Sequence, residues 1–199
     1  MKIFLIRHAQ TLGNLVSNYV GCTDEPLAPE GIATAQRATP DSSVRLVYTS
    51  KLARTIQTAG ILYPNATVVS HAGLNEMNFG AFEGRNWREL ERDAEYSAWV
   101  SSRCESQCPG GEDKNGFSLR CRNAFGSIVR EHRSAGTATA HFVVHGGVIM
   151  AIMSGLVLPK RDYFSWSVGF CGGFVIESSG NESFTLCETL IAPESGNAV

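Results

Sequence analysis

The stretch Lys2-Ile3-Phe4-Leu5-Ile6-Arg7-His8-Ala9-Gln10-Thr11 decides the fold of this 199-residue chain. Its apolar residues 2–6 predict a short buried strand that ends at an arginine and a histidine. Far downstream, 141–144 predicts a second such strand, which runs into His145-Gly146-Gly147. Because open parallel sheets carry their chemistry at the carboxyl ends of the strands, we expect both strand ends to present a histidine at one functional edge.

Strands and helical stretches alternate along the rest of the chain. Further strands are predicted at 45–48 and 67–69, and helices at 29–36, 50–59, 87–99, 117–132 and 148–153, with Ser50 as the candidate N-cap of the 50–59 helix. This alternation predicts an α/β fold in which helices cover both faces of a mostly parallel sheet, a three-layer αβα sandwich. Near the end, 173–177 and 183–187 flank the turn-rich residues 178–182, which predicts an edge hairpin and therefore a mixed sheet.

Length and composition favour one domain over residues 1–199. The chain is 43% hydrophobic, and no linker rich in Pro, Gly or Ser divides it. Within it we expect 85–115 to form a lid-like insertion over the site and the small, polar residues 192–199 to form a loose tail.

Charge and hydropathy exclude several classes of partner. Seventeen basic residues stand against 19 acidic ones, and no run of Lys or Arg suits a phosphate backbone, so nucleic acid is not an expected partner. The first apolar run is interrupted by Arg7 too early for a signal peptide, and no stretch approaches about 18 apolar residues. We therefore expect a cytoplasmic protein without a membrane partner.

The cysteines do not form a recognisable framework. Six are scattered along a chain too large to need disulfides, which favours free thiols. Cys104, Cys108 and Cys121 are a weak alternative as a zinc site, because their spacing is not standard and no histidine is placed to complete it. We expect no metal and no cofactor.

A cationic pocket results if the two strand ends and the start of the 50–59 helix converge. It would contain Arg7, His8, Arg54 and His145. Two guanidiniums offer paired donors for a phosphate dianion, and the backbone amide of Gly146 adds a donor at a helix N-terminus. Neighbouring positive charge disfavours an imidazolium, so one histidine is expected to stay neutral near pH 7 and to attack phosphorus.

Such a reaction also needs a group that exchanges protons with the leaving alcohol and with water. Glu76, in the segment 74–80, and Glu83, close behind it, are the two candidates. Glu76 is preferred because it follows a strand-like segment, whereas Glu83 lies among glycines in a looser stretch.

Other residues with chemical potential have no such pattern. His71, His132 and His141 are expected to be surface or structural histidines. The tryptophans are expected to pack in the interior, with Trp87 as a candidate for the substrate mouth.

Five motifs resemble those of the histidine phosphatase superfamily, the phosphoglycerate mutase-like fold, in the same order and along nearly the whole chain. Residues 5–14, 21–31, 50–59, 74–84 and 143–147 resemble, respectively, the nucleophile motif, the segment that follows it, the second-arginine helix, the acid/base loop and the second-histidine motif. Departures are small: Ala9 and Gln10 stand where many members have Gly-Glu, and Val144 where a serine often precedes the second histidine.

The resemblance implies a role for each candidate residue. His8 would be the nucleophile, Arg7, Arg54 and His145 phosphate ligands, Glu76 the acid/base, and Asn14, Gly21 and Gly146 further phosphate contacts. These implied roles agree with those reasoned from the residues themselves.

Within this family, the resemblance favours hydrolysis over isomerisation. Residues 87–112 are acidic early and end in Pro109-Gly110-Gly111-Glu112, which resembles the small phosphatase branch, including the α-ribazole phosphatases. The expected substrate is a small phosphorylated metabolite, with α-ribazole phosphate as one candidate. A phosphoglycerate mutase and a catalytically silent phospholigand-binding module remain the alternatives, and a homodimer is left open.

Overall fold

A seven-stranded sheet forms the centre of the computed structural model, which describes residues 1–38, 40–178 and 183–192. Its strands are β1 (Lys2–Arg7), β2 (Leu46–Thr49), β3 (Thr67–Ser70), β4 (Thr139–Val144), β5 (Val157–Leu158), β6 (Gly173–Ser178) and β7 (Phe184–Leu190). The α-helices in the described ranges are α1 (Leu12–Leu15), α2 (Pro29–Arg37), α3 (Ala53–Leu62), α4 (Trp87–Leu90), α5 (Ala94–Ser101), α6 (Lys114–Ser134) and α7 (Gly146–Leu156). Short 3-10 helices are η1 (Ala72–Leu74), η2 (Gly80–Phe82) and η3 (Tyr163–Trp166).

The sheet is mixed, as the sequence predicts. The strand order is β3-β2-β4-β1-β6-β7-β5. The first four strands in this order run parallel, β6 is antiparallel to both β1 and β7, and β5 pairs parallel with β7. The predicted α/β class and the antiparallel pair of the hairpin are therefore confirmed, while residues 179–182 between β6 and β7 lie outside the described residues.

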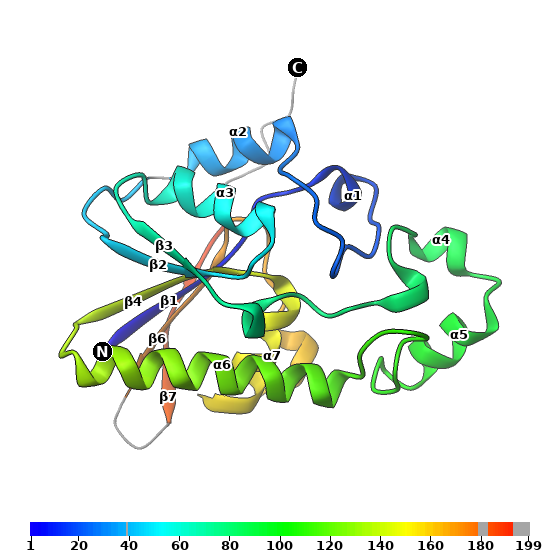
Figure 1. Cartoon of the computed structure of the whole chain (residues 1–199). Helices are drawn as coiled ribbons and strands as arrows, with labels where there is room; N and C mark the ends of the chain where they lie inside the picture. Colours follow the sequence, from blue (N-terminus) through cyan, green and yellow to red (C-terminus); the bar gives the residue numbers. More distant parts are fainter. Residues whose placement is uncertain (39, 179–182, 193–199) are drawn as a thin grey trace.

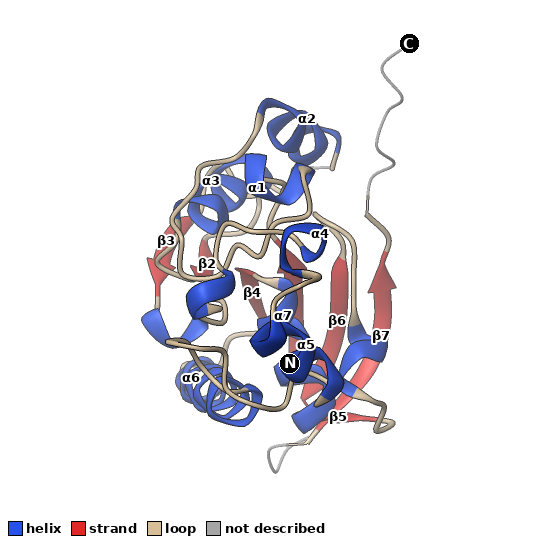
Figure 2. Ribbon diagram, turned by 90° about the vertical axis from the view of Figure 1, so that its right-hand side faces the viewer, coloured by secondary structure: helices blue, strands red, loops and turns tan. Residues whose placement is uncertain are grey.

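Helices cover both faces of the sheet. Figure 1 shows α3, with α2 beside it, on one face and α6 and α7 on the other, and Figure 2 shows the same layers after a quarter turn. Because successive strand residues point to opposite faces, Leu5 and Phe142 pack in the apolar cluster that includes α6 and α7, whereas Ile6 and Val143 pack with Leu62 of α3. The predicted three-layer sandwich is confirmed.

The helical stretch predicted over 87–99 is divided. Asn86 caps α4 by accepting hydrogen bonds from the amides of Arg88 and Glu89, and Asp93 caps α5 in the same way. Asp93 starts a new helix at this point, because its side chain accepts hydrogen bonds from the otherwise unpaired amides in the first turn of α5. The helix predicted to continue from residue 87 is therefore interrupted before Asp93. Both short helices lie beyond the carboxyl ends of β1 and β4 (Figure 1).

Two further expectations concern the ends and the surface of the fold. In residues 1–38, 40–178 and 183–192, no helix combines the length and apolarity that a membrane crossing needs. The tail expected over 192–199 lies, apart from Ala192, outside the described residues.

Candidate active site

The two predicted histidines meet because β1 and β4 are paired in a particular register. Arg7 lies opposite Val144 in the parallel ladder, and the amide of His8 donates to the carbonyl of Val144 over 2.9 Å. The next residue of each strand end is therefore a histidine. Their ring centroids are 5.0 Å apart, with the ring planes inclined by 68°.

The tautomer of His8 follows from its contacts. Nδ1 lies 2.6 Å from the carbonyl oxygen of Ala9, which only accepts, so Nδ1 carries the proton and Nε2 keeps a lone pair. Thr58 of α3 accepts from the amide of Ala9 and holds this turn in place. Burial lowers the pKa of His8 well below its usual value, and the charges of Arg54 and Arg7 lower it further. His8 is thus a buried, neutral imidazole with a free basic nitrogen.

Arg54 is fully buried, and the hydrogen-bond acceptors around its guanidinium are neutral groups. Its guanidinium donates to the carbonyls of Val20, Gly21 and Thr23, and its Nε donates to Nδ1 of His145 over 3.3 Å. In the described part of the chain no carboxylate shares a hydrogen bond with it. Carbonyls satisfy the donors without cancelling the charge, so the positive field is preserved for a bound anion.

Arg7 is held at the other side of His8. Its Nη1 donates to the carbonyl of Val168 over 2.7 Å, and its guanidinium carbon lies 3.8 Å from the ring centroid of Phe170. Its Nε is buried without a partner among the described residues. Gly146, at the N-terminus of α7, lies against this Nε, since a Cβ on Gly146 would be 3.4 Å from it. An unpaired donor beside a helix N-terminus favours an anion at this position.

His145 is held by a directed chain of hydrogen bonds. Because the Nε of Arg54 only donates, Nδ1 of His145 accepts and Nε2 carries the proton, which it donates to Oγ of Ser50 over 2.8 Å. Ser50 also accepts from the amide of Leu52 and lies 2.9 Å from the hydroxyl of Thr55. The sequence indicated Ser50 as a helix cap, but α3 begins at Ala53 and Ser50 instead fixes the tautomer of His145.

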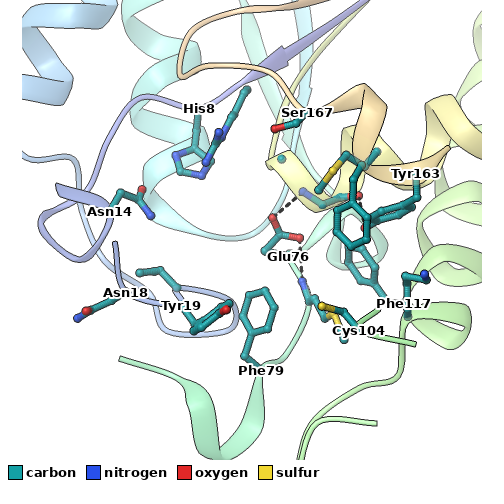
Figure 3. A pocket seen from close by; sticks show the side chains of 18 of the residues that line it. His8, Asn14, Asn18, Tyr19, Glu76, Phe79, Cys104, Phe117, Tyr163 and Ser167 are labelled. Atoms are coloured by element: carbon teal, nitrogen blue, oxygen red, sulfur yellow. Dashed lines mark hydrogen bonds between the residues drawn. The ribbon is translucent and has the colours of Figure 1, made fainter. Parts of the chain in front are cut away.

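Glu76 lies in the loop after η1 and lines a cavity together with His8 (Figure 3). Oε1 accepts from the amide of Met77 over 3.0 Å, and Oε2 accepts from the amide of Gly147 over 2.9 Å (Figure 3). Desolvation raises the pKa of Glu76 above its usual value, although the two amides and the charge of Arg54 oppose the shift. A carboxyl with a raised pKa is suited to exchanging protons near neutral pH.

The loop that carries Glu76 is anchored by Arg120 of α6. Its Nη1 donates to the carbonyls of Gly73 and Asn75, and its Nε and Nη2 form a bidentate pair with Glu112 at 3.0 and 2.8 Å. Glu112 in turn accepts from the amide of Asn78. The Pro-Gly-Gly-Glu segment therefore positions the loop that carries Glu76.

Glu83, the competing carboxylate, has a different role. It accepts from the amides of Gly21, Cys22, Thr23 and Phe79 and from the hydroxyl of Thr23. Desolvation acts to raise the pKa of Glu83, but these hydrogen bonds outweigh it and leave the pKa below its usual value. A carboxylate saturated with donors stays ionised and joins two loops, so the geometry favours Glu76 for proton transfer.

Gly21 does not take the place that the resemblance implied. Its amide is bound by Glu83, its carbonyl accepts from Arg54, and it is absent from the lining of the cavity. Its lack of a side chain serves a close approach, because a Cβ would lie 1.8 Å from the carbonyl oxygen of Met77. Gly21 therefore supports Arg54 in this structure and has no free donor for phosphate.

A cavity of about 350 Å³ joins these groups. Of the candidate residues, Arg7, His8, Asn14, Glu76 and Gly146 line it, and Arg54 and His145 lie directly behind. Asn14 uses Oδ1 to accept from the amide of Thr11, and Nδ2 has no partner in the described part of the chain.

Tryptophan at the cavity is placed differently from expectation. Trp87 is 52% exposed and does not line the cavity, whereas Trp99, expected only to pack, does. The division of the helix at Asp93 turns α5, and with it Trp99, toward the site.

Side chains that could ligate a metal form no cluster in the part of the chain that the structure describes. All six cysteines are free. Among residues 1–38, 40–178 and 183–192, no three His, Cys, Asp or Glu side chains are grouped so as to hold a metal ion.

Comparison with known proteins agrees with this geometry. The family model described as "Histidine phosphatase superfamily (branch 1)" matches residues 3–186. The chain belongs to the histidine phosphatase superfamily. Members similar to it include the adenosylcobalamin/alpha-ribazole phosphatase of Escherichia coli, 32% identical over 84% of this chain and 85% of the relative.

The names of other similar proteins do not all agree on one activity. A 2,3-bisphosphoglycerate-dependent phosphoglycerate mutase 2 of Gloeobacter violaceus is 30% identical over 92% of this chain and 88% of its own length. The crystal structure of the alpha-ribazole phosphatase from Shigella flexneri superposes with a TM-score of 0.78 and 27% identity, covering 100% of this chain and 99% of that one. The superfamily therefore includes both phosphatases and mutases among the relatives of this chain, and the choice between the two reactions has to be argued from the residues of the site.

Gly147→Ala is expected to displace the acid/base carboxyl. The added Cβ would lie 2.3 Å from Oε1 of Glu76, so the carboxyl must move. Because a misplacement of about 1 Å can lower a rate about 100-fold, we expect kcat for an alkyl phosphate to fall by that order. Gly60→Ala is the matched control, since nothing lies within 4 Å of its Cβ position. Equal kcat values for the two variants would contradict the assigned position of Glu76.

Ser50→Ala is expected to release the tautomer of His145. Loss of the acceptor leaves the N–H at Nε2 buried and unpaired, which disfavours this tautomer by about 1–3 kcal/mol. We expect kcat/KM to fall about tenfold as a result. The ¹⁵N shifts of His145 report the tautomer directly, and Ser50→Thr, which keeps the hydroxyl, is expected to restore them. A fall in kcat/KM that Ser50→Thr fails to rescue, with unchanged ¹⁵N shifts, would show that Ser50 acts only on stability.

Proposed function

We propose that this chain is a metal-independent phosphomonoester hydrolase that acts through a covalent phosphohistidine on His8. The observation that carries the proposal is the fixed tautomer of His8, whose free Nε2 shares a cavity with the carboxyl of Glu76. Arg7, Asn14 and the amide of Gly146 line the cavity and are proposed to bind the phosphate directly. Arg54 and His145 lie behind the cavity with their hydrogen bonds already formed, and they are proposed to act on the phosphate from there, Arg54 through its charge and His145 by packing against His8. The expected substrate is a small phosphorylated metabolite, and the name of the Escherichia coli relative makes α-ribazole phosphate a candidate.

In the first step, Nε2 of His8 attacks phosphorus and the bond from phosphorus to the ester oxygen breaks. Protonated Glu76 gives its proton to the departing oxygen, so an alcohol leaves and Glu76 becomes a carboxylate. The positive charge on the phosphorylated ring is balanced by the oxygens of the phosphoryl group. Arg7 and Arg54 stabilise the charge on those oxygens during transfer.

In the second step, water attacks the phosphoryl group opposite His8. Glu76 now accepts the proton of the water, the bond between phosphorus and Nε2 breaks, and its electron pair returns to the ring. Inorganic phosphate leaves, and both His8 and Glu76 regain their first states. One carboxyl thus serves as acid and then as base, which its raised pKa favours.

Two alternatives use the same cavity. The relative named as a phosphoglycerate mutase supports an isomerase, in which the phosphoryl group returns from His8 to a sugar acid. A silent phospholigand-binding module is disfavoured because no expected histidine, arginine or carboxyl is missing from the site. Product analysis with 3-phosphoglycerate separates isomerisation from phosphate release.

His8→Ala is expected to abolish turnover. Because removal of a covalent nucleophile leaves only the contribution of the binding groups, kcat for p-nitrophenyl phosphate should fall about 1,000-fold or more. Wild-type protein quenched in alkaline denaturant should carry a phosphoryl group that the variant lacks, measured by ³¹P NMR and mass spectrometry, because a phosphohistidine is stable in base and hydrolyses in acid. His71→Asn, which keeps an acceptor for the amide of Gly73, is the control. Undiminished turnover in His8→Ala would refute the mechanism.

Glu76→Gln is expected to affect esters according to their leaving group. An alkyl alcohol needs the proton of Glu76, so its release should slow by about 100- to 10,000-fold, whereas p-nitrophenolate leaves without it. Because the pKa of Glu76 is raised, its acid form persists to higher pH than in an ordinary glutamate, and the alkyl rate falls as pH rises through that pKa. Parallel pH profiles of kcat/KM for the two esters measure this difference; an equal loss for both would contradict the role of Glu76.

A further inference from the structure

The cavity extends beyond the phosphate-binding groups to an aromatic wall. We use this name for Tyr19, Phe79, Trp99, Phe117, Tyr163 and Phe164. They come from the loop after α1, the residue before η2, α5, α6 and η3, so segments far apart in sequence supply one surface. Figure 3 shows Glu76 with His8 and Asn14 to one side and Phe117 and Tyr163 to the other.

The hydroxyl groups of the aromatic wall are already used. The hydroxyl of Tyr19 lies 2.8 Å from that of Tyr96, and the hydroxyl of Tyr163 donates to the carbonyl of Gly147 over 3.2 Å. The two tyrosines therefore offer ring surface rather than polar groups to a ligand. Phe117 is fully buried at the back of the cavity, and Phe164 is 43% exposed at its rim.

Among the described residues that line the aromatic end of the cavity, Lys114 is the only cation, and it is already paired with a carboxylate. The ammonium of Lys114 lies 3.0 Å from a carboxylate oxygen of Glu105 and 5.4 Å from the ring centroid of Tyr163. Arg7, by contrast, keeps an unpaired Nε at the phosphate end. The two ends of the cavity thus differ in kind: one has spare positive charge, and the other has apolar ring surface without it.

We propose that the aromatic wall binds the alcohol part of the phosphate ester and selects an uncharged alcohol that carries a planar apolar ring. This inference rests on the proposed function, because it places the phosphate beside His8 and the ester oxygen beside Glu76. From there the alcohol extends toward Phe117 and Tyr163. Rings pack well on such walls through offset or edge contacts, whereas a carboxylate would lose its water without gaining a free cation.

Binding of three phosphonates tests the selection without turnover. Propylphosphonate, 3-phenylpropylphosphonate and 3-carboxypropylphosphonate share one anionic head and one chain, and they differ at the far end. Because burying a phenyl group contributes about 1.5–3 kcal/mol, the phenyl compound should bind about 10- to 100-fold more tightly than propylphosphonate by isothermal titration calorimetry. The carboxylate compound should bind no more tightly than propylphosphonate.

Two variants locate the effect. Phe164→Ala removes an exposed ring of the aromatic wall and should lower the phenyl-to-propyl affinity ratio about 3- to 10-fold. Trp87→Ala is the matched control, because it removes an exposed ring outside the cavity and should leave the ratio unchanged. A ratio that falls equally in both variants would overturn the assignment to the aromatic wall.

The outcomes separate this inference from the function on which it rests. Tighter binding of the carboxylate compound than of the phenyl compound, weakened by Lys114→Met, would overturn the inference and support the sugar-acid alternative. Equal affinities in a protein that hydrolyses propyl phosphate through His8 would overturn the inference alone. A phenyl preference in a protein that hydrolyses no ester would support the aromatic site and contradict the proposed hydrolase.

Discussion

The parallel pairing of β1 with β4 is the constraint on which the site depends. Residues opposite each other in a parallel ladder end their strands at the same edge, so the pairing of Arg7 with Val144 makes His8 and His145 neighbours. A shift of one residue would move each side chain to the other face of the sheet. That shift is opposed by the apolar residues of both strands, which alternate between two packed helical layers. The burial that stabilises the fold therefore also sets the distance between the histidines.

Gathering positive charge in a desolvated place is unfavourable unless its donors are satisfied. The chain satisfies Arg54 with backbone carbonyls of the loop over residues 20–23, and it holds that loop with the carboxylate of Glu83. The negative charge stays one loop away from the guanidinium hydrogen bonds. Both histidines remain neutral because burial and the nearby arginines lower their pKa values. The result is a desolvated site with two arginine charges and neutral histidines, which suits the phosphate dianion that we propose it binds.

Local signals predicted the parts of the site that lie within single elements. Strand ends carry His8 and His145, and α3 carries Arg54, so apolar runs and motif spacing were sufficient to find them. Positions that depend on tertiary contacts were missed. In the sequence, Arg120 looks like an ordinary charged residue of a helix and Ser50 like a helix cap. Their partners in the fold are the carbonyl of Glu76, 44 positions from Arg120, and the ring of His145, 95 positions from Ser50. The aromatic wall was missed for the same reason, since its members belong to separate segments and have no common period.

The two ends of the cavity act on Glu76 together. Apolar surface on one side removes water and raises its pKa, while two amides and nearby arginines limit that rise. An apolar alcohol seated on the aromatic wall would exclude still more water and keep Glu76 protonated until the ester bond breaks. Its departure would then open the same space to the water that attacks the phosphohistidine. An alcohol recognised through apolar contacts thus favours the acid form of Glu76 while it is bound and the base form once it has left, which is the order that hydrolysis needs.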